Sequence, residues 1–307
     1  MHIIILSART GWQTDELCRA LDVRGHVGCV LPYEGLVAGL GSGQRGLTSE
    51  HTSVLDADAV LARIVPAGTL EQIIYRVDAL HWVEEHGVPV VNSPRTIERC
   101  VDKFFTTALL EQAGLPVPET IVCERGSDAI AAVRRIGDVV VKPIFGSLGH
   151  GMVRVTSPDV ALRVVEPLEQ IGSIFYVQRT IDHGGRDVRA FVVGGQVIGA
   201  IERTAPAGDW RTNVSRGGTV RPFELPPDWT RLAVHAAAAV GADYAGVDLL
   251  PSRQGEVFVL EVNGIPGWKG LQQATGVDVA GAIVDHVVAR VRGRDAARDV
   301  QPTGLVR

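Results

Sequence analysis

The sequence predicts an α/β fold that begins with a parallel sheet and ends with an antiparallel one. Up to residue 92, apolar strands alternate with helical segments, and this order favours a parallel sheet with helices on its faces. After residue 187, strands joined by turn signals such as Gly194–Gly195 predict antiparallel pairing. A length of 307 residues allows two or three domains, each with its own core.

The composition excludes several classes of function. Hydrophobic residues make up 46% and charged residues 21% of the chain, which is typical of a globular protein, and the net charge of −5 provides no basic field for nucleic acid. No apolar run has the length of a membrane span, and the N-terminus lacks the features of a signal peptide. The four cysteines lack metal-ligand spacing and indicate free thiols. We therefore predict a cytoplasmic protein without membrane or nucleic-acid partners.

The first predicted domain covers residues 1–92. Its strands are expected at 2–8, 26–31, 58–65 and 88–92, and its helices at 14–25 and 69–87. The loop after the first strand lies at a carboxyl edge, where open α/β sheets bind ligands. Trp12 in this loop could stack on an aromatic substrate and Arg9 could pair with a carboxylate; alternatively, Trp12 packs as core beneath the first helix.

A glycine pattern at residues 41–46 matches the spacing of dinucleotide-binding loops. It neither follows a strand nor precedes a convincing helix, so we interpret it as a surface loop. The chain also lacks the G-x-x-x-x-G-K-[ST] pattern, which excludes a P-loop.

A second domain is predicted at 93–181 and a third at 182–293, followed by a frayed tail at 294–307. The second domain should contain helices at 93–114, 127–137 and 158–172 and strands at 119–124, 139–144, 152–156 and 173–181. The third should contain strands at 187–194 and 196–203, a polar loop at 205–218, helices at 228–240 and 278–291, and a hairpin with arms at 244–250 and 256–262.

Three oxygen-bearing side chains interrupt this last hairpin. Asp248 lies on the first arm and is expected opposite the start of the return arm, whereas Glu261 and Asn263 lie at the end of the return arm. Residues two apart on a strand point to one face, and sheet twist could bring all three together. Carboxylate and amide oxygens suit Mg²⁺, which usually shares its shell with nucleotide phosphates. The pattern predicts a magnesium site; the alternative is strand-end charges and an Asn in a turn.

Lys142 ends an apolar strand and precedes a glycine-rich turn at 146–151. Burying a lysine is costly unless its ammonium meets an anion, and glycines let backbone N–H groups approach phosphate oxygens. The segment therefore predicts phosphate binding; the alternative is an edge lysine beside an ordinary turn. Lys103, on a predicted helix, would by itself be a solvated charge.

Arginines gather on the hairpin at 187–203 and in the loop that follows it. They are Arg189, Arg203, Arg211 and Arg216. Such guanidinium density in an acidic protein favours recognition of phosphate or carboxylate, because the forked donors bind these groups bidentately. The alternative is that they pair with local acids, namely Asp187, Glu202 and Asp209.

The order of these features resembles the ATP-grasp superfamily, and specifically the RimK-like amino-acid ligases. The resemblance covers essentially the whole chain, with least support at residues 30–60. It is carried by KPIFGSLGHGM, DVRAFVVGGQVIGAIERTA, DWRTNVSRGG and AGVDLL…EVNGIPG. It implies an ATP-grasp fold, in which a Rossmann-like domain precedes two α+β subdomains that clamp ATP.

The resemblance also implies roles for matched residues. Lys103 and Lys142 would contact the phosphates and the adenine face, and the loop containing Gly146, Ser147, Gly149 and Gly151 would close over the triphosphate. The hinge of Gln178, Arg179, Thr180 and Ile181 would bind adenine, Asp187 would reach the ribose, and Asn213 would join the nucleotide site. Arg179 departs from the family pattern, because relatives commonly have an acid there.

At the reacting end, the resemblance implies that Asp248, Glu261 and Asn263 hold two Mg²⁺ ions, which Mn²⁺ could replace. Arg203, Arg211 and Arg216 would line the reacting centre, and Arg189 would bind phosphate or a substrate carboxylate. The protein would be a homo-oligomer, either a dimer or a tetramer.

The implied activity is ATP-dependent amide formation. A carboxylate becomes reactive towards an amine when the γ-phosphoryl group of ATP converts it to an acyl phosphate, and ADP and phosphate result. The segments SARTGW and PGWKGLQ resemble members that add L-glutamate to a methanopterin- or methanofuran-type cofactor.

Other functions stay open at this point. The ligase could act on a ribosomal or carrier-protein C-terminus. The chain could instead be a non-catalytic nucleotide-binding protein, or a dinucleotide-dependent oxidoreductase suggested only by its first α/β domain.

Overall fold

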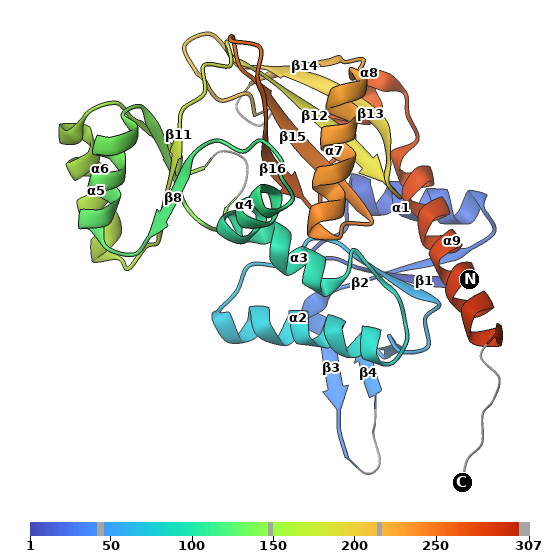
Figure 1. Cartoon of the computed structure of the whole chain (residues 1–307). Helices are drawn as coiled ribbons and strands as arrows, with labels where there is room; N and C mark the ends of the chain where they lie inside the picture. Colours follow the sequence, from blue (N-terminus) through green and yellow to red (C-terminus); the bar gives the residue numbers. More distant parts are fainter. Residues whose placement is uncertain (42–45, 147–149, 214–216, 301–307) are drawn as a thin grey trace.

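The computed structural model describes residues 1–41, 46–146, 150–213 and 217–300, without the side chains of 295 and 297–300. A parallel sheet from the N-terminal part lies beside an antiparallel sheet from the C-terminal part, and a second antiparallel sheet stands to one side of both (Figure 1). None of the helices in the described ranges combines the length and apolar character needed to span a bilayer.

The first sheet is parallel throughout, as predicted, with strand order β2-β1-β6-β7. Its strands are β1 (His2–Leu6), β2 (Val27–Leu31), β6 (Ala59–Ala62) and β7 (Val90–Val91), and its helices are α1 (Trp12–Val23) and α2 (Leu70–Glu85). The apolar runs of β1 and β6 are buried on both faces, which explains why continuous apolar segments identified them.

The part of the chain that connects β2 to β6 forms a small antiparallel sheet that was not predicted. It contains β3 (Leu36–Gly39), β4 (Gly46–Ser49) and β5 (Thr52–Ser53), preceded by the 3₁₀ turn η1 (Tyr33–Gly35). These strands have two to four residues each, too few to show a clear apolar alternation. The predicted loop at 41–46 joins β3 to β4, and its residues 42–45 lie outside the described ranges.

The single helix predicted at 93–114 is wrong, because two helices occupy this segment. They are α3 (Pro94–Val101) and α4 (Lys103–Gln112). Asp102 between them has an extended backbone, and its carboxylate accepts a hydrogen bond from the Phe105 amide, which caps the second helix. Lys103 is thereby the first residue of a helix and not part of its middle.

The central sheet is antiparallel, with order β10-β9-β11-β8. Its strands are β8 (Thr120–Cys123), β9 (Val139–Lys142), β10 (Val153–Val155) and β11 (Phe175–Arg179). Two helices, α5 (Gly126–Ile136) and α6 (Pro158–Gln170), lie on the face turned away from the rest of the molecule (Figure 1). Val141, Val155 and Phe175 belong to a separate core between this sheet and its helices.

The C-terminal sheet has five antiparallel strands in the order β14-β13-β12-β15-β16. They are β12 (Arg186–Val193), β13 (Gln196–Thr204), β14 (Thr219–Pro222), β15 (Tyr244–Pro251) and β16 (Val257–Asn263). The helices are α7 (Pro227–Val240), α8 (Lys269–Thr275) and α9 (Val279–Val300). Neither β14 nor α8 was predicted, because both are short.

The hairpin of β15 and β16 forms as predicted, but its register differs. Asp248 pairs with Glu261 near the end of the return arm, and not with the start of that arm. A register shift follows at once, since Leu249 pairs with Val259. The two carboxylates are therefore cross-strand neighbours without any need for sheet twist.

One core joins the first sheet to the C-terminal part. Ile3 and Leu17 from the first domain share a buried cluster with Trp268 and with Val284 of α9. Helices α3 and α4 pack against α7 and β16, so they lie with the C-terminal sheet in space. The predicted domain boundaries stay predictions. In this packing, the first sheet, α3, α4 and the C-terminal sheet lie together, whereas the central sheet has a core of its own.

The last helix is longer than predicted. It was expected to end at Val291, whereas α9 continues to Val300. The frayed tail predicted at 294–307 is thus wrong up to residue 300, and residues 301–307 lie outside the described part of the chain.

Candidate active site

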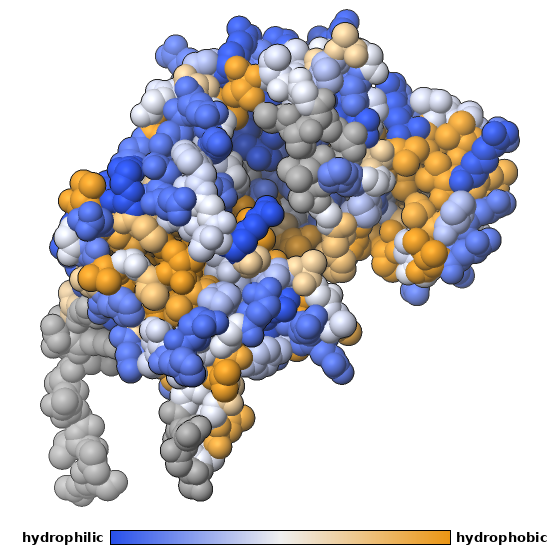
Figure 2. Space-filling model, turned by 180° about the vertical axis from the view of Figure 1, so that it is seen from behind, coloured by the Kyte–Doolittle hydropathy of each residue, from blue (hydrophilic) through white to orange (hydrophobic). Residues whose placement is uncertain are grey.

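Of the predicted site residues that the structure describes, all but Gly151 line one cavity of about 370 Å³. It lies between the central sheet and the C-terminal sheet, and Figure 2 shows the corresponding hollow among hydrophilic side chains. Residues of α4, β9 and β11 line one wall, and residues of β12, β13, β15 and β16 line the other. The cavity also reaches Gln13 of the first domain. Beside it, the cavity is lined by residues of the C-terminal segment 267–271.

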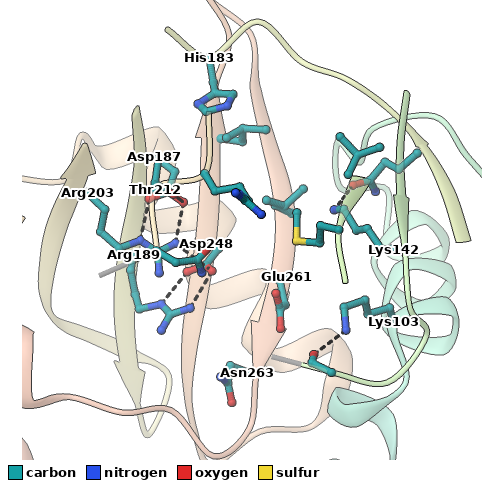
Figure 3. A pocket seen from close by; sticks show the side chains of 18 of the residues that line it. Lys103, Lys142, His183, Asp187, Arg189, Arg203, Thr212, Asp248, Glu261 and Asn263 are labelled. Atoms are coloured by element: carbon teal, nitrogen blue, oxygen red, sulfur yellow. Dashed lines mark hydrogen bonds and ion pairs between the residues drawn. The ribbon is translucent and has the colours of Figure 1, made fainter. Parts of the chain in front are cut away.

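Asp248, Glu261 and Asn263 point into this cavity from neighbouring strands (Figure 3). Asp248 is 5% exposed, and the Asn263 amide oxygen accepts a hydrogen bond from the Ile265 amide at 3.0 Å. Glu261 has no hydrogen-bond or ion-pair partner among the described residues. A half-buried carboxylate without a partner, facing a second carboxylate, fits a divalent cation.

The donor set suits Mg²⁺ better than a soft metal. Two carboxylates and one amide oxygen are hard ligands, and within the described ranges no three His, Cys, Asp or Glu residues gather as a metal cluster. Both Asp248 oxygens already face arginine: Oδ2 meets Arg189 and Arg203, whereas Oδ1 accepts only from Arg189 and keeps a further lone pair for a cation.

Two arginines neutralise Asp248. Arg189 binds it bidentately at 2.6 and 2.7 Å, and Arg203 approaches to 3.0 Å. Burial raises the pKa of this carboxyl, but the two guanidinium groups outweigh burial and lower the pKa to about 2. Asp248 is therefore ionised at every physiological pH.

Arg203 also binds Asp187 through two hydrogen bonds of 2.7 and 2.6 Å, and Thr212 donates to the same carboxylate. Burial disfavours the charge of Arg203, yet Asp248 and Asp187 together hold its pKa above the usual range. Asp187 thus orients Arg203 in this structure, and its predicted contact with a ribose stays a prediction.

The alternative for the arginine cluster, pairing with local acids, is confirmed in part. Arg203 pairs with Asp187, and Arg211 pairs with Asp209 at 2.8 Å. Glu202 pairs with arginines that were not in the predicted cluster, Arg221 and Arg186. Arg189, Arg203 and Arg211 nevertheless line the cavity, whereas Arg216 lies outside the described residues.

The two predicted phosphate-binding lysines lie on the wall opposite the arginines (Figure 3). Lys142 donates to the Gln178 side chain at 2.6 Å, and Lys103 donates to the carbonyl oxygen of Gly146 at 2.7 Å. Burial lowers the pKa of both, to about 8 for Lys142, while nearby Glu261 acts in the opposite direction. The two ammonium groups have no acid bonded to them in the described structure, which leaves them available for an anion.

The predicted hinge runs along the rim of the cavity. Gln178, Arg179, Thr180 and Ile181 all line it. The Arg179 and Thr180 amides donate to the carbonyl oxygens of Glu119 and Asp138, whereas Ile181 has no such backbone bond in the described structure. The Arg179 guanidinium is partly exposed and pairs with Glu119.

The glycine loop is described only at its ends. Gly146 and Gly151 adopt positive φ values of 140° and 71°, which favour glycine at both positions. Gly146 and Asn213 line the cavity. Ser147 and Gly149 lie outside the described residues, so their predicted roles stay predictions.

Sequence reasoning missed two buried residues of the first domain that hold the hairpin of β15 and β16 in place. Asn92 donates to the carbonyl oxygens of Tyr244 and Gly264 and accepts from the amides of Asp243 and Tyr244. Arg63, 2% exposed, donates to the Pro266 carbonyl oxygen. The only signal in the sequence that could have identified either residue was the charge of Arg63 at the end of an apolar strand.

The residues that follow β1 do not lie where the predicted substrate contacts of Trp12 and Arg9 would place them. Trp12 packs 6.2 Å from Trp268, centroid to centroid, and does not line the cavity. Arg9 is exposed and also lies away from the cavity lining. The packing alternative for Trp12 therefore describes this structure better.

The parallel domain, the two antiparallel sheets and the cavity between them define the class of ATP-grasp ligases. Residues 1–97 match the family model of the RimK PreATP-grasp domain, and residues 100–287 match that of the RimK-like ATP-grasp domain. The chain belongs to the RimK-like ATP-grasp family and is an ATP-dependent carbon–nitrogen ligase.

Similar proteins agree with this assignment. A tetrahydromethanopterin:alpha-L-glutamate ligase of Methanosarcina acetivorans is 37% identical over 76% of this chain and 80% of its own length. A probable alpha-L-glutamate ligase of Aliivibrio fischeri is 34% identical over 94% and 95%. A RimK domain ATP-grasp protein of Sphaerobacter thermophilus has a TM-score of 0.73 at 26% identity, covering 94% of this chain and all of that one. These matches confirm the predicted ATP-grasp fold and family.

Proposed function

We propose that this ligase adds L-glutamate to a carboxylate on the tail of a one-carbon cofactor of the methanopterin or methanofuran type. The observation that carries the proposal is the meeting of Asp248, Glu261 and Asn263 in one cavity with buried Lys142 and half-buried Lys103, neither of which pairs with an acid in the described structure. The relative from Methanosarcina acetivorans, named for glutamate addition to tetrahydromethanopterin, supports the choice of substrates.

In the proposed complex, ATP lies between the two walls of the cavity. Lys103 and Lys142 bind its phosphates, the hinge at 178–181 binds adenine through the backbone of Ile181, and Asp187 lies within reach of the ribose. Asp248, Glu261 and Asn263 would hold two Mg²⁺ ions, or Mn²⁺ in their place, and these ions would neutralise phosphate charge during transfer. A solved relative complexed with Mg and ADP shares this fold at a TM-score of 0.74 and 23% identity.

The residues of the chain then serve phosphoryl transfer. Arg189, Arg203 and Arg211 line the side of the cavity where the acceptor carboxylate meets the γ-phosphate, and their charges offset the charge that develops there. Closure of the loop at 146–151 would exclude water from the acyl phosphate. The acceptor carboxylate takes the γ-phosphoryl group, which gives an acyl phosphate and ADP. The amine of glutamate then attacks the acyl carbon, loses a proton and displaces inorganic phosphate, which leaves the amide.

Two other functions have less support. Action on a protein C-terminus is compatible with the fold, but the peptide-bound neighbours are 17–24% identical to this chain and show the fold alone. A non-catalytic nucleotide-binding role would not require Glu261 to stand without a partner beside Asp248. None of the described residues that line the cavity favours the oxidoreductase alternative.

We also propose a homo-oligomer, either a dimer or a tetramer. Large apolar side chains lie exposed on α2, among them Leu70 at 75% and Ile74 at 48%. Such a surface is typical of a contact between protein chains.

Binding of ATP should take up a proton above about pH 8, because free Lys142 has a pKa of about 8 and bound phosphates favour its charged form. The low pKa of Lys142 also affects stability, because burying its charged form makes the folded protein less stable below pH 8. Between pH 8 and 10.5, Lys142 has lost its proton in the folded protein but keeps it in the unfolded chain, so the free energy of unfolding should rise with pH. Calorimetric titration with a non-hydrolysable ATP analogue, in buffers of different ionisation enthalpy, measures the uptake. Lys142→Met should abolish it; uptake that persists in this variant would contradict the assignment.

The substrate proposal is tested by product mass. The enzyme is incubated with Mg²⁺, ATP and L-glutamate together with tetrahydromethanopterin, a methanofuran, or a peptide with a ribosomal-protein C-terminus. We expect the mass of one or more glutamyl residues to appear on a cofactor and not on the peptide. Glutamylation of the peptide alone would replace the proposed function with the protein-directed alternative.

A further inference from the structure

The distribution of lysine in this chain singles out one residue with no role so far. The chain has 30 basic residues of the lysine and arginine types, and only Lys103, Lys142 and Lys269 are lysines. All three line the same cavity. Every other residue in this set is therefore arginine, whereas this cavity retains compact ammonium groups, which differ from guanidinium in size and donor geometry. Two of the three already have a proposed role at the phosphates.

Lys269 lies on the side of the cavity formed by the first domain and the segment 267–271. It is exposed, it lies 5.8 Å from the ring centroid of Trp12, and no acid among the described residues pairs with it. By contrast, the arginines that line the cavity pair with Glu119, Asp248, Asp187 or Asp209. Lys269 is therefore a cavity cation whose charge nothing in the described protein neutralises.

Gln13 supplies an oriented donor beside it. Its side-chain oxygen accepts a hydrogen bond from Arg63 at 3.3 Å, and because arginine only donates, this contact assigns the amide orientation. The Nε2 group has no acceptor among the described residues, and a Cβ placed on Gly267 would lie 3.4 Å from it. The donor thus lies against Gly267, two residues before Lys269.

Arg63 adds positive charge behind this amide. It is 2% exposed, and its side-chain partners in the described structure are neutral: the Tyr244 hydroxyl, the Gln13 amide, the Pro266 carbonyl oxygen and the face of Trp268 at 4.8 Å. No carboxylate in the described part of the chain pairs with it. A buried cation without an acid favours an anion nearby.

We propose that Gln13 and Lys269 form a carboxylate-binding subsite, which holds a substrate carboxylate that is not being activated. Arg63 acts as a positioning residue that fixes the Gln13 amide. Both substrates of the proposed reaction carry carboxylates, so the group can come from L-glutamate or from the acceptor. This inference rests on the proposed function, because that function supplies the two substrates.

The test compares wild type with Lys269→Met, which removes the charge, and Gln13→Glu, which keeps the acceptor for Arg63 but replaces the donor with an acid. Arg231→Met is the matched control, since it removes an exposed positive charge on α7, away from the cavity. Enzyme saturated with Mg-ADP is titrated with L-glutamate or with tetrahydromethanopterin, and the Kd for ADP is measured separately.

We expect both subsite variants to weaken the same one of the two ligands by about tenfold or more, as expected for loss of a charge-assisted contact. The ligand that is weakened identifies the source of the carboxylate. The Kd for ADP and the control variant should stay within about twofold of wild type. If L-glutamate is that ligand, L-glutamine or the α-amide of glutamate should lose the sensitivity to Lys269→Met.

Unchanged affinity of both ligands in Lys269→Met would overturn the subsite while leaving the ligase assignment intact. Failure of wild-type enzyme to bind either ligand would instead contradict the proposed substrates before any variant is compared. A fall in ADP affinity equal to the fall in ligand affinity would place Lys269 with the nucleotide and also overturn the inference.

Discussion

Glu261→Gln should reduce kcat by about a hundredfold or more while leaving thermal stability nearly unchanged, because the loss of a metal-ligating charge removes several kcal/mol of transition-state stabilisation. Glu261 has no partner among the described residues, so its neutralisation breaks no contact of the fold. Steady-state rates at saturating Mg²⁺ and a thermal melt measure the two effects.

Glu256→Gln is the matched control, since it lies exposed in the same hairpin and should behave as wild type. Asp248→Asn is a less selective test, because it would leave Arg189 and Arg203 without their shared carboxylate and should also lower stability. Turnover of Glu261→Gln within a few-fold of wild type would contradict the metal assignment.

Asn92→Ala should lower the free energy of unfolding by about 3 kcal/mol or more, since it leaves backbone groups at the start of β15 and just after β16 without partners. Asn92 is fully buried, so water cannot readily replace it. Chemical denaturation measures the change.

Ser93→Ala provides the scale for this experiment. Ser93 caps α3 by accepting a hydrogen bond from the Thr96 amide, and its loss should cost only about 1 kcal/mol. Equal destabilisation by both variants would mean that Asn92 is an ordinary polar contact and does not fix the hairpin.

The fold was largely predictable where the signal is local. Continuous apolar runs identified β1 and β6, and the Gly194–Gly195 turn identified the hairpin of β12 and β13. The break at Asp102 was missed because an aspartate inside a helical pattern gives little warning that its side chain will cap a new helix. Strands β3 to β5 were too short for their periodicity to be visible.

The site was predictable only as a set of residue types. Asp248 and Glu261 were recognised by their chemistry, but their direct pairing depends on a register shift that the sequence does not show. The partner of each arginine was likewise uncertain: Arg203 proved to bind Asp187 and Asp248 together. Contacts between distant segments, such as Arg63 with Gln13 and Pro266, became visible only in the folded chain.

The nucleotide products test the central account most directly. The reaction with Mg²⁺, ATP, L-glutamate and the panel of acceptors described above is followed by ³¹P NMR. The account predicts ADP and inorganic phosphate in equal amounts, formed together with the glutamylated product. Formation of AMP and pyrophosphate would contradict transfer of the γ-phosphoryl group to a carboxylate and would indicate adenylation instead.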